Sequence, residues 1–139
     1  MKNLIIPYEL AVKAKLNAKQ RVIEEKRLEI LLDTINYFDS SKLNIENGYE
    51  CKYYPVNKSK EGCAIGRLIE DKKLCEELDS EKLTDVGTIF NKLPNNLKEL
   101  GEDFLIDLQN LHDRSNNWGE DGLSEIGYPY FIDMLIDHC

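Results

Sequence analysis

The chain has 139 residues, of which 42% are hydrophobic and 32% are charged, a composition typical of a single soluble globular domain. Its net charge of −8 argues against general nucleic-acid binding, because such binding depends on Lys and Arg neutralising phosphates. No apolar run approaches the ~18 residues of a membrane span. The apolar run after Lys2 is also too short for a signal peptide, so we expect a cytoplasmic protein that does not associate with membranes.

The first half of the sequence predicts one long helix followed by a small hairpin. Apolar residues recur at helical spacing between a candidate N-cap at Asn17 and the end of the pattern at Phe38. The aromatic run 49–54 (YECKYY) predicts a strand that ends at Pro55, since proline cannot donate to a ladder. We expect this strand to pair with residues 61–65 across a polar loop.

The second half predicts shorter helices. We expect helical segments at 63–78 with a break near Asp71, at 84–94 with Thr84 as N-cap and Pro94 at the end, at 95–113, and after Ser124. Gly101 lies inside the third of these segments, where a glycine costs roughly 1 kcal/mol against alanine. It therefore suggests that another helix approaches closely at this point.

These elements predict a helix-dominated α+β fold with about four to five helices and a small β-hairpin. The absence of repeats, low-complexity tracts and linkers indicates one compact domain over residues 1–139. The helical stripes predict that one core contains Leu28, Leu31, Ile35, Phe104, Leu108 and Leu111.

The segment Gly62-Cys63-Ala64-Ile65-Gly66-Arg67 admits two interpretations. Backbone N–H groups at a helix entry and the Arg67 guanidinium could hold an anion. Alternatively, the glycines permit a close backbone approach and the small residues form a packing corner. The segment is not a P-loop, because the lysine and hydroxyl of that motif are absent.

A second candidate region, LHDRSNNW, combines residue types that suit a nucleotide-like ligand. Arginine pairs with phosphate, tryptophan offers a stacking face, and histidine and asparagine contact polar edges. The candidate ligand-binding residues are Tyr53, Arg67, His112, Asp113, Arg114, Asn116 and Trp118. The alternative is structural: Asp113 and the asparagines form turns, His112 caps a helix, and Trp118 packs on the core. We expect the two regions to face each other and form one pocket.

The four cysteines, Cys51, Cys63, Cys75 and Cys139, contain no C-x-x-C pair. We therefore expect reduced thiols, with neither a metal nor another cofactor.

Three groups of motifs, CKYY…GCAIGRLI, VGTIF…LP…LKELGEDFL…LQNLHDRSNNW and GLSEIG, resemble a family of small uncharacterised proteins of tailed bacteriophages and prophages. The similarity runs from about Leu28 to about Gly127. The resemblance implies action inside an infected bacterium. Small accessory phage proteins block host enzymes, mimic DNA or sequester nucleotide-derived immune signals.

Three functional hypotheses follow. The first is a non-catalytic counter-defence protein that binds and sequesters a nucleotide-derived anion. The second is an acidic inhibitor that binds a host protein. The third is a small hydrolase using His112 and Asp113. The sequence leaves homo-oligomerisation open.

Overall fold

The computed structural model describes residues 8–46, 50–55, 61–82 and 85–139, and in the first helix it describes side chains from Asn17 onward. The α-helices in these ranges are α1 (Tyr8–Tyr37), α2 (Lys72–Ser80), α3 (Val86–Ile89), α4 (Asn95–Lys98), α5 (Glu102–Asp113) and α6 (Tyr128–His138). The strands are β1 (Ile45–Glu46), β2 (Glu50–Cys51), β3 (Trp118–Gly119) and β4 (Gly122–Leu123), and 3₁₀ turns occupy Gly66–Leu68, Phe90–Lys92 and Ser115–Asn117. The predicted helix-dominated α+β class is confirmed.

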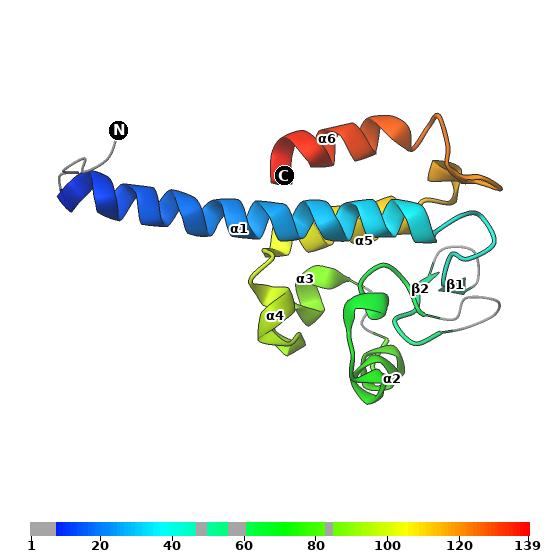
Figure 1. Cartoon of the computed structure of the whole chain (residues 1–139). Helices are drawn as coiled ribbons and strands as arrows, with labels where there is room; N and C mark the ends of the chain where they lie inside the picture. The colour runs from blue at the N-terminus through cyan, green and yellow to red at the C-terminus, as the bar shows by residue number, and fades with distance from the viewer. Residues whose placement is uncertain (1–7, 47–49, 56–60, 83–84) are drawn as a thin grey trace.

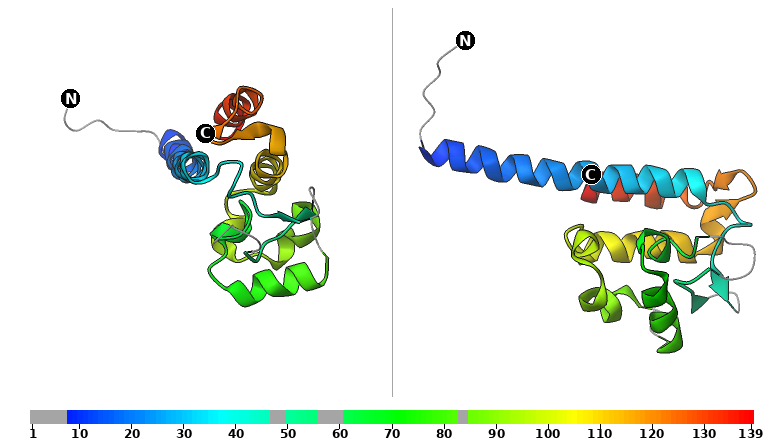
Figure 2. Two further views of the ribbon diagram at one scale, coloured as in Figure 1. Left: turned by 90° about the vertical axis from the view of Figure 1, so that its right-hand side faces the viewer. Right: turned by 60° about the horizontal axis from the view of Figure 1, so that its bottom comes forward.

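The helices are arranged around α5 (Figure 1). The C-terminal half of α1 runs beside α5 and α6, while α2, α3, α4 and the β1–β2 hairpin lie on the opposite side of α5 from α6 (Figures 1 and 2). The N-terminal half of α1 extends well beyond the rest of the described chain (Figure 2). None of the described helices combines the length and the apolar content that crossing a membrane requires.

One hydrophobic core joins α1 and α5 to the shorter helices and the loops. Leu31, Phe104 and Leu108 are buried in this cluster, and the predicted residues Leu111 and Ile35 belong to it or pack against it. The prediction for Leu28 is wrong, because this side chain is 36% exposed and is not part of the cluster.

The predicted helix 95–113 is two helices, α4 and α5, because the chain turns sharply at Gly101. Gly101 has φ +92°, a conformation that residues with a Cβ rarely adopt. The turn leaves the Leu100 carbonyl outside a helix, and the Arg27 Nε–H donates to it at 2.7 Å. Gly101 therefore marks a helix boundary, which corrects its expected place in a helix interior.

Helix starts were predicted with mixed success. The break near Asp71 is confirmed, since the Asp71 carboxylate caps α2 by accepting the Lys73 N–H at 3.0 Å. Helix α1 begins at Tyr8, so the predicted start at Asn17 is wrong. Thr84 lies outside the described residues, and the N-cap of α3 is Asp85.

The predicted pairing of residues 49–54 with 61–65 is wrong. Strand β2 pairs instead with β1, in the register Ile45↔Cys51 and Glu46↔Glu50. The 61–65 segment contacts the predicted strand through a backbone bond from the Cys63 N–H to the Lys52 carbonyl at 3.1 Å. A second hairpin, β3–β4, was not predicted.

The glycines of the GCAIGR segment are explained by a close backbone approach. A Cβ on Gly62 would lie 2.2 Å from the Tyr53 carbonyl oxygen, and a Cβ on Gly66 would lie 2.0 Å from the same atom. Both distances are shorter than any van der Waals contact, so the Tyr53 backbone excludes side chains at both positions. The packing interpretation of this corner is therefore confirmed.

Two glycine substitutions should change stability in opposite directions. We expect Gly66→Ala to lower the free energy of unfolding by at least about 2 kcal/mol, because the methyl group overlaps the Tyr53 backbone. Gly87→Ala in α3 should raise it by about 0.5–1 kcal/mol, since its Cβ would meet no atom nearer than 3.5 Å. Urea denaturation measures both, and equal effects of the two substitutions would contradict this packing.

Candidate functional site

His112 and Asp113 lie in a buried hydrogen-bond network. The His112 ring is fully buried, and its Nε2 accepts the Asn44 backbone N–H at 3.0 Å. A nitrogen that accepts carries no proton, so His112 is neutral and its Nδ1–H donates to the Asp113 carboxylate at 2.8 Å. Asp113 also accepts from Gln109 Nε2 at 2.6 Å, and Gln109 Oε1 accepts the Ile65 N–H at 3.3 Å. Both ring nitrogens of His112 are therefore used to hold the fold.

Tyr53 and Trp118, two of the candidate ligand-binding residues, are buried, which corrects their expected place at a site, whereas the neighbouring Tyr54 is exposed. Trp118 is packed near Phe38, with ring centroids 5.9 Å apart, and its Nε1–H donates to the Leu111 carbonyl at 2.9 Å. Tyr53 is fully buried, and its backbone N–H donates to the Asp79 carboxylate at 2.9 Å. Neither ring presents a face to a ligand in this structure.

Arg67 is surrounded by carboxylates. It forms ion pairs with Asp33 at 2.5 Å and with Glu61, and its guanidinium lies 4.1 Å from the centre of the Tyr37 ring. Burial lowers the pKa of Arg67, but the hydrogen bonds to Glu61 and Asp33 outweigh burial and raise it above its ordinary value. The adjoining depression is also lined by Glu70 and Lys72, so its three carboxylates outnumber its two cations and do not favour a phosphate.

Arg114 and Asn116 are exposed, but they do not share a pocket with Arg67. Arg114 lines a cleft between α5 and α6, whereas Arg67 lines the separate depression beside Asp33. The Asn116 carbonyl accepts a hydrogen bond from Ser124 Oγ at 2.6 Å. The predicted shared pocket is therefore wrong, although the Ile65–Gln109–Asp113 hydrogen bonds do connect the two sequence regions.

The cleft between α5 and α6 is the strongest candidate site in the described part of the chain. It encloses about 230 Å³ and is lined by Asp107, Asn110, Leu111, Arg114, Tyr130, Asp133, Met134 and Asp137. The four residues from each segment follow the same spacing, three, four and seven positions after the first, so each set occupies one helix face. The buried Leu111 and Met134 side chains supply its apolar part.

The cleft is acidic, and Arg114 is the only Lys or Arg among its lining residues. At one end Arg114 donates to the Tyr130 hydroxyl at 2.5 Å and lies 4.9 Å from the Tyr130 ring centre. At the other end His138 Nε2 lies 2.6 Å from the Asp107 carboxylate. Asp133 and Asp137, one turn apart on α6, form no ion pair or side-chain hydrogen bond with any residue that the structure describes.

The polar groups available in the cleft are three carboxylates, one amide, one phenol and one guanidinium. They include no cysteine, serine or threonine that could serve as a nucleophile. Within the described residues, no group of three or more His, Cys, Asp and Glu side chains is arranged to hold a metal ion.

Cys63, Cys75 and Cys139 are thiols, and the Cys51 side chain lies outside the described residues. Burial raises the pKa of Cys75 to about 11, which keeps it protonated and unreactive near neutral pH.

Sequence reasoning found Arg114 but missed the aspartates of the cleft. Asp133 and Asp137 follow the pattern of a solvated helix face, and Asp107 lies within the apolar pattern of α5. The spacing of Asp107 and Arg114 could have shown that they share a face. Nothing in the sequence shows that α6 packs beside that face.

A scan against protein-family models and searches of curated proteins and of solved structures found no match to this chain. The resemblance to phage and prophage proteins therefore stays a prediction from its motifs.

The structural role of His112 can be tested by comparison with an exposed neighbour. We expect His112→Ala to lower the free energy of unfolding by at least about 2 kcal/mol, because it leaves the buried Asn44 N–H without an acceptor and opens a cavity. Asn116→Ala should change it by less than about 0.5 kcal/mol, since that side chain is exposed. If the two variants unfold at the same urea concentration, the network does not hold the fold together.

Proposed function

We propose that this chain is a non-catalytic binding protein that docks a basic segment of a partner protein in the cleft between α5 and α6. The observation that carries the proposal is the set of three aspartates, Asp107, Asp133 and Asp137, around an apolar floor. Asp133 and Asp137 form no ion pair with any described residue, so their charges are not neutralised within the described part of the chain. A Lys or Arg side chain would complement them.

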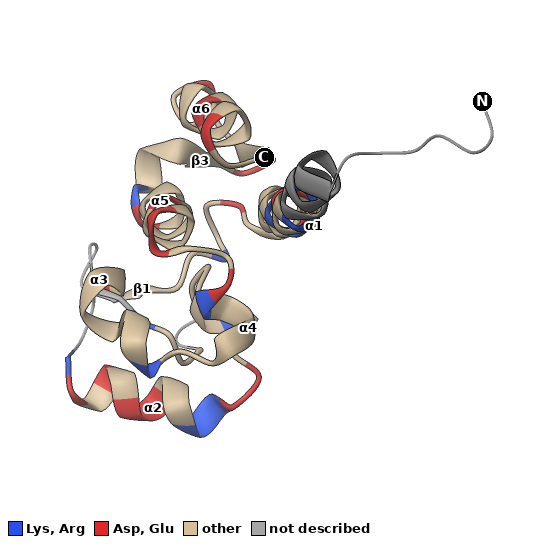
Figure 3. Ribbon diagram, turned by 90° about the vertical axis from the view of Figure 1, so that its left-hand side faces the viewer, with Lys and Arg blue, Asp and Glu red and all other residues tan. Residues whose placement is uncertain are grey.

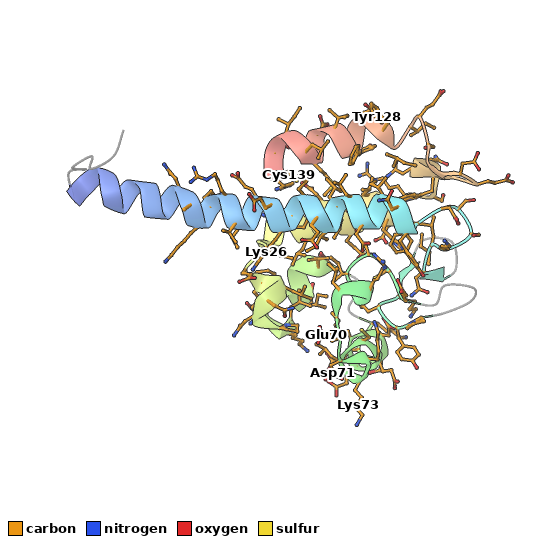
Figure 4. All side chains as sticks on the ribbon, viewed as in Figure 1. Lys26, Glu70, Asp71, Lys73, Tyr128 and Cys139 are labelled. Atoms are coloured by element: carbon orange, nitrogen blue, oxygen red, sulfur yellow. The ribbon has the colours of Figure 1, made fainter. Side chains whose placement is uncertain are left out.

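The surface beside the cleft favours a protein partner over a small ion. Tyr130, which lines the cleft, is 43% exposed, and Tyr128 projects outward from the start of the same helix on another of its faces (Figure 4). Acidic residues occur on both α5 and α6 (Figure 3). An exposed aromatic residue at a charged cleft is typical of protein-binding surfaces.

The other two hypotheses have less support. Binding of a nucleotide-like anion needs cations and a stacking face, yet Arg67 is paired with two carboxylates and Trp118 is buried. A hydrolase using His112 needs an accessible base, and this ring is fully buried with both nitrogens engaged. The proposed partner is therefore a host protein, in keeping with a counter-defence protein of the phage type.

A labelled peptide of alternating Arg and Leu residues tests the cleft by fluorescence anisotropy. We expect Asp133→Asn combined with Asp137→Asn to weaken binding at least about tenfold, or 1.4 kcal/mol. Glu76→Gln combined with Glu77→Gln on α2 removes the same charge at exposed positions and should weaken binding less than about twofold.

If both variants weaken peptide binding equally, the peptide is attracted by the overall negative charge of the protein, which would contradict binding in the cleft. A separate thermal melt with ATP tests the anion hypothesis, since a bound ligand raises the melting temperature. A rise that Arg114→Ala abolishes would favour that hypothesis over the present proposal.

A further inference from the structure

The cleft between α5 and α6 has two chemically different ends. His138, at the end of α6, lies 2.6 Å from the carboxylate of Asp107, which is in the first half of α5. Tyr130, near the start of α6, accepts at 2.5 Å from Arg114, which directly follows α5. The two helices therefore run antiparallel, with Asp107 at one end of the cleft and Arg114 at the other.

The carboxylates of α6 lie at some distance from the guanidinium. Asp137 directly precedes His138 and so lies at the Asp107 end, whereas Asp133 lies between that end and Tyr130. An α-helix rises 1.5 Å per residue, so the point midway between the two α6 aspartates is about 7–8 Å along the helix from Tyr130. The cleft thus keeps its negative and positive charges apart by about this distance.

Neither sign of charge is neutralised by the other. Arg114 forms no ion pair with a carboxylate in the described part of the chain, and Asp133 and Asp137 form none there with a cation. Arg114 is held instead by a neutral group, since it donates to the Tyr130 hydroxyl and lies 4.9 Å from the ring centre. Stacking uses the face of a guanidinium and leaves its other N–H groups able to donate. The cleft therefore offers donors at one end and acceptors towards the other.

We propose that the docked segment is dipolar: an Arg or Lys side chain lies between Asp133 and Asp137, and an Asp or Glu side chain two residues away pairs with Arg114. This inference rests on the proposed function, because it specifies which segments the cleft selects. In an extended chain, side chains two residues apart point to the same side and lie about 7 Å apart, which matches the separation of charges in the cleft. The apolar floor of Leu111 and Met134 suits the aliphatic parts of both side chains.

The overall charge of the protein predicts the opposite preference. A net charge of −8 and the three aspartates of the cleft repel an acidic residue, so general attraction favours a segment that has a cation and no carboxylate. A cation of the cleft that meets the carboxylate of the segment reverses this order. Arg114 is the only Lys or Arg that lines the cleft, so the reversal should depend on this residue.

Two labelled peptides that differ in one residue test the pairing by fluorescence anisotropy. One is Leu-Arg-Leu-Glu-Leu with both ends blocked, and the other has Gln in place of Glu. We expect the wild-type protein to bind the Glu peptide at least about threefold more tightly, which is the size of an exposed ion pair. Arg114→Gln removes the cation, so this variant should bind the two peptides equally. Asp133→Asn combined with Asp137→Asn should weaken the binding of both peptides at least about tenfold.

Lys73→Gln is the matched control for Arg114→Gln. Lys73 is exposed on α2, on the other side of α5 from α6, and its substitution removes the same charge away from the cleft (Figure 4). This variant should keep the preference for the Glu peptide.

The outcomes separate this inference from the proposed function. If both peptides bind equally and both depend on the two α6 aspartates, the dipolar pairing is wrong and the proposed function stands. A preference for the Glu peptide that Arg114→Gln retains would also overturn the pairing. If neither peptide binds, or if the aspartate substitutions leave binding unchanged, the proposed function fails and the inference fails with it.

Discussion

The hydrogen bond from the Asn44 backbone N–H to the buried ring of His112 is the interaction on which the arrangement of the middle of the chain depends. The described residues between Leu43 and Ile69 contain little regular structure, and only some of their backbone groups bond to one another. Side chains take over this role. His112 and Gln109 of α5 accept the N–H groups of Asn44 and Ile65, and Asp79 of α2 accepts that of Tyr53. These bonds hold an irregular segment against two helices.

This network explains why distinctive residues of the sequence, among them His112, Asn117 and Trp118, are used to hold the fold. Histidine, aspartate, asparagine and tryptophan can bind a nucleotide because they offer directional donors and acceptors, and buried backbone groups need the same donors and acceptors. At the end of α5 the Leu111 carbonyl accepts both the Trp118 indole N–H and the Asn117 side-chain amide. The LHDRSNNW motif thus ends one helix and anchors the loop that follows it.

Much of the fold could be predicted from local pattern, because local steric and capping rules are recorded in nearby residues. The Asp71 helix cap and the close approach at Gly66 are examples. Several of the errors depended on distant partners. Gly101 separates α4 from α5 at the point where the Arg27 side chain donates to the Leu100 carbonyl. Strand β2 pairs with β1, and Asn44, the residue before β1, is bonded to His112 of α5. The cleft aspartates were missed for the same reason, since only packing decides whether a helix face is solvated or lines a site.

The acidic composition has different consequences in different parts of the molecule. Where a carboxylate pairs with a cation of the same chain, as Asp33 pairs with Arg67, the ion pair fixes the position of a loop. The charge of that carboxylate is then neutralised within the chain. Asp133, Asp137, Glu25 and Glu29 meet no such cation among the described residues, and the last two lie one turn apart with like charge. Keeping like charges close together costs stability in an isolated chain. A partner of opposite charge would remove that cost.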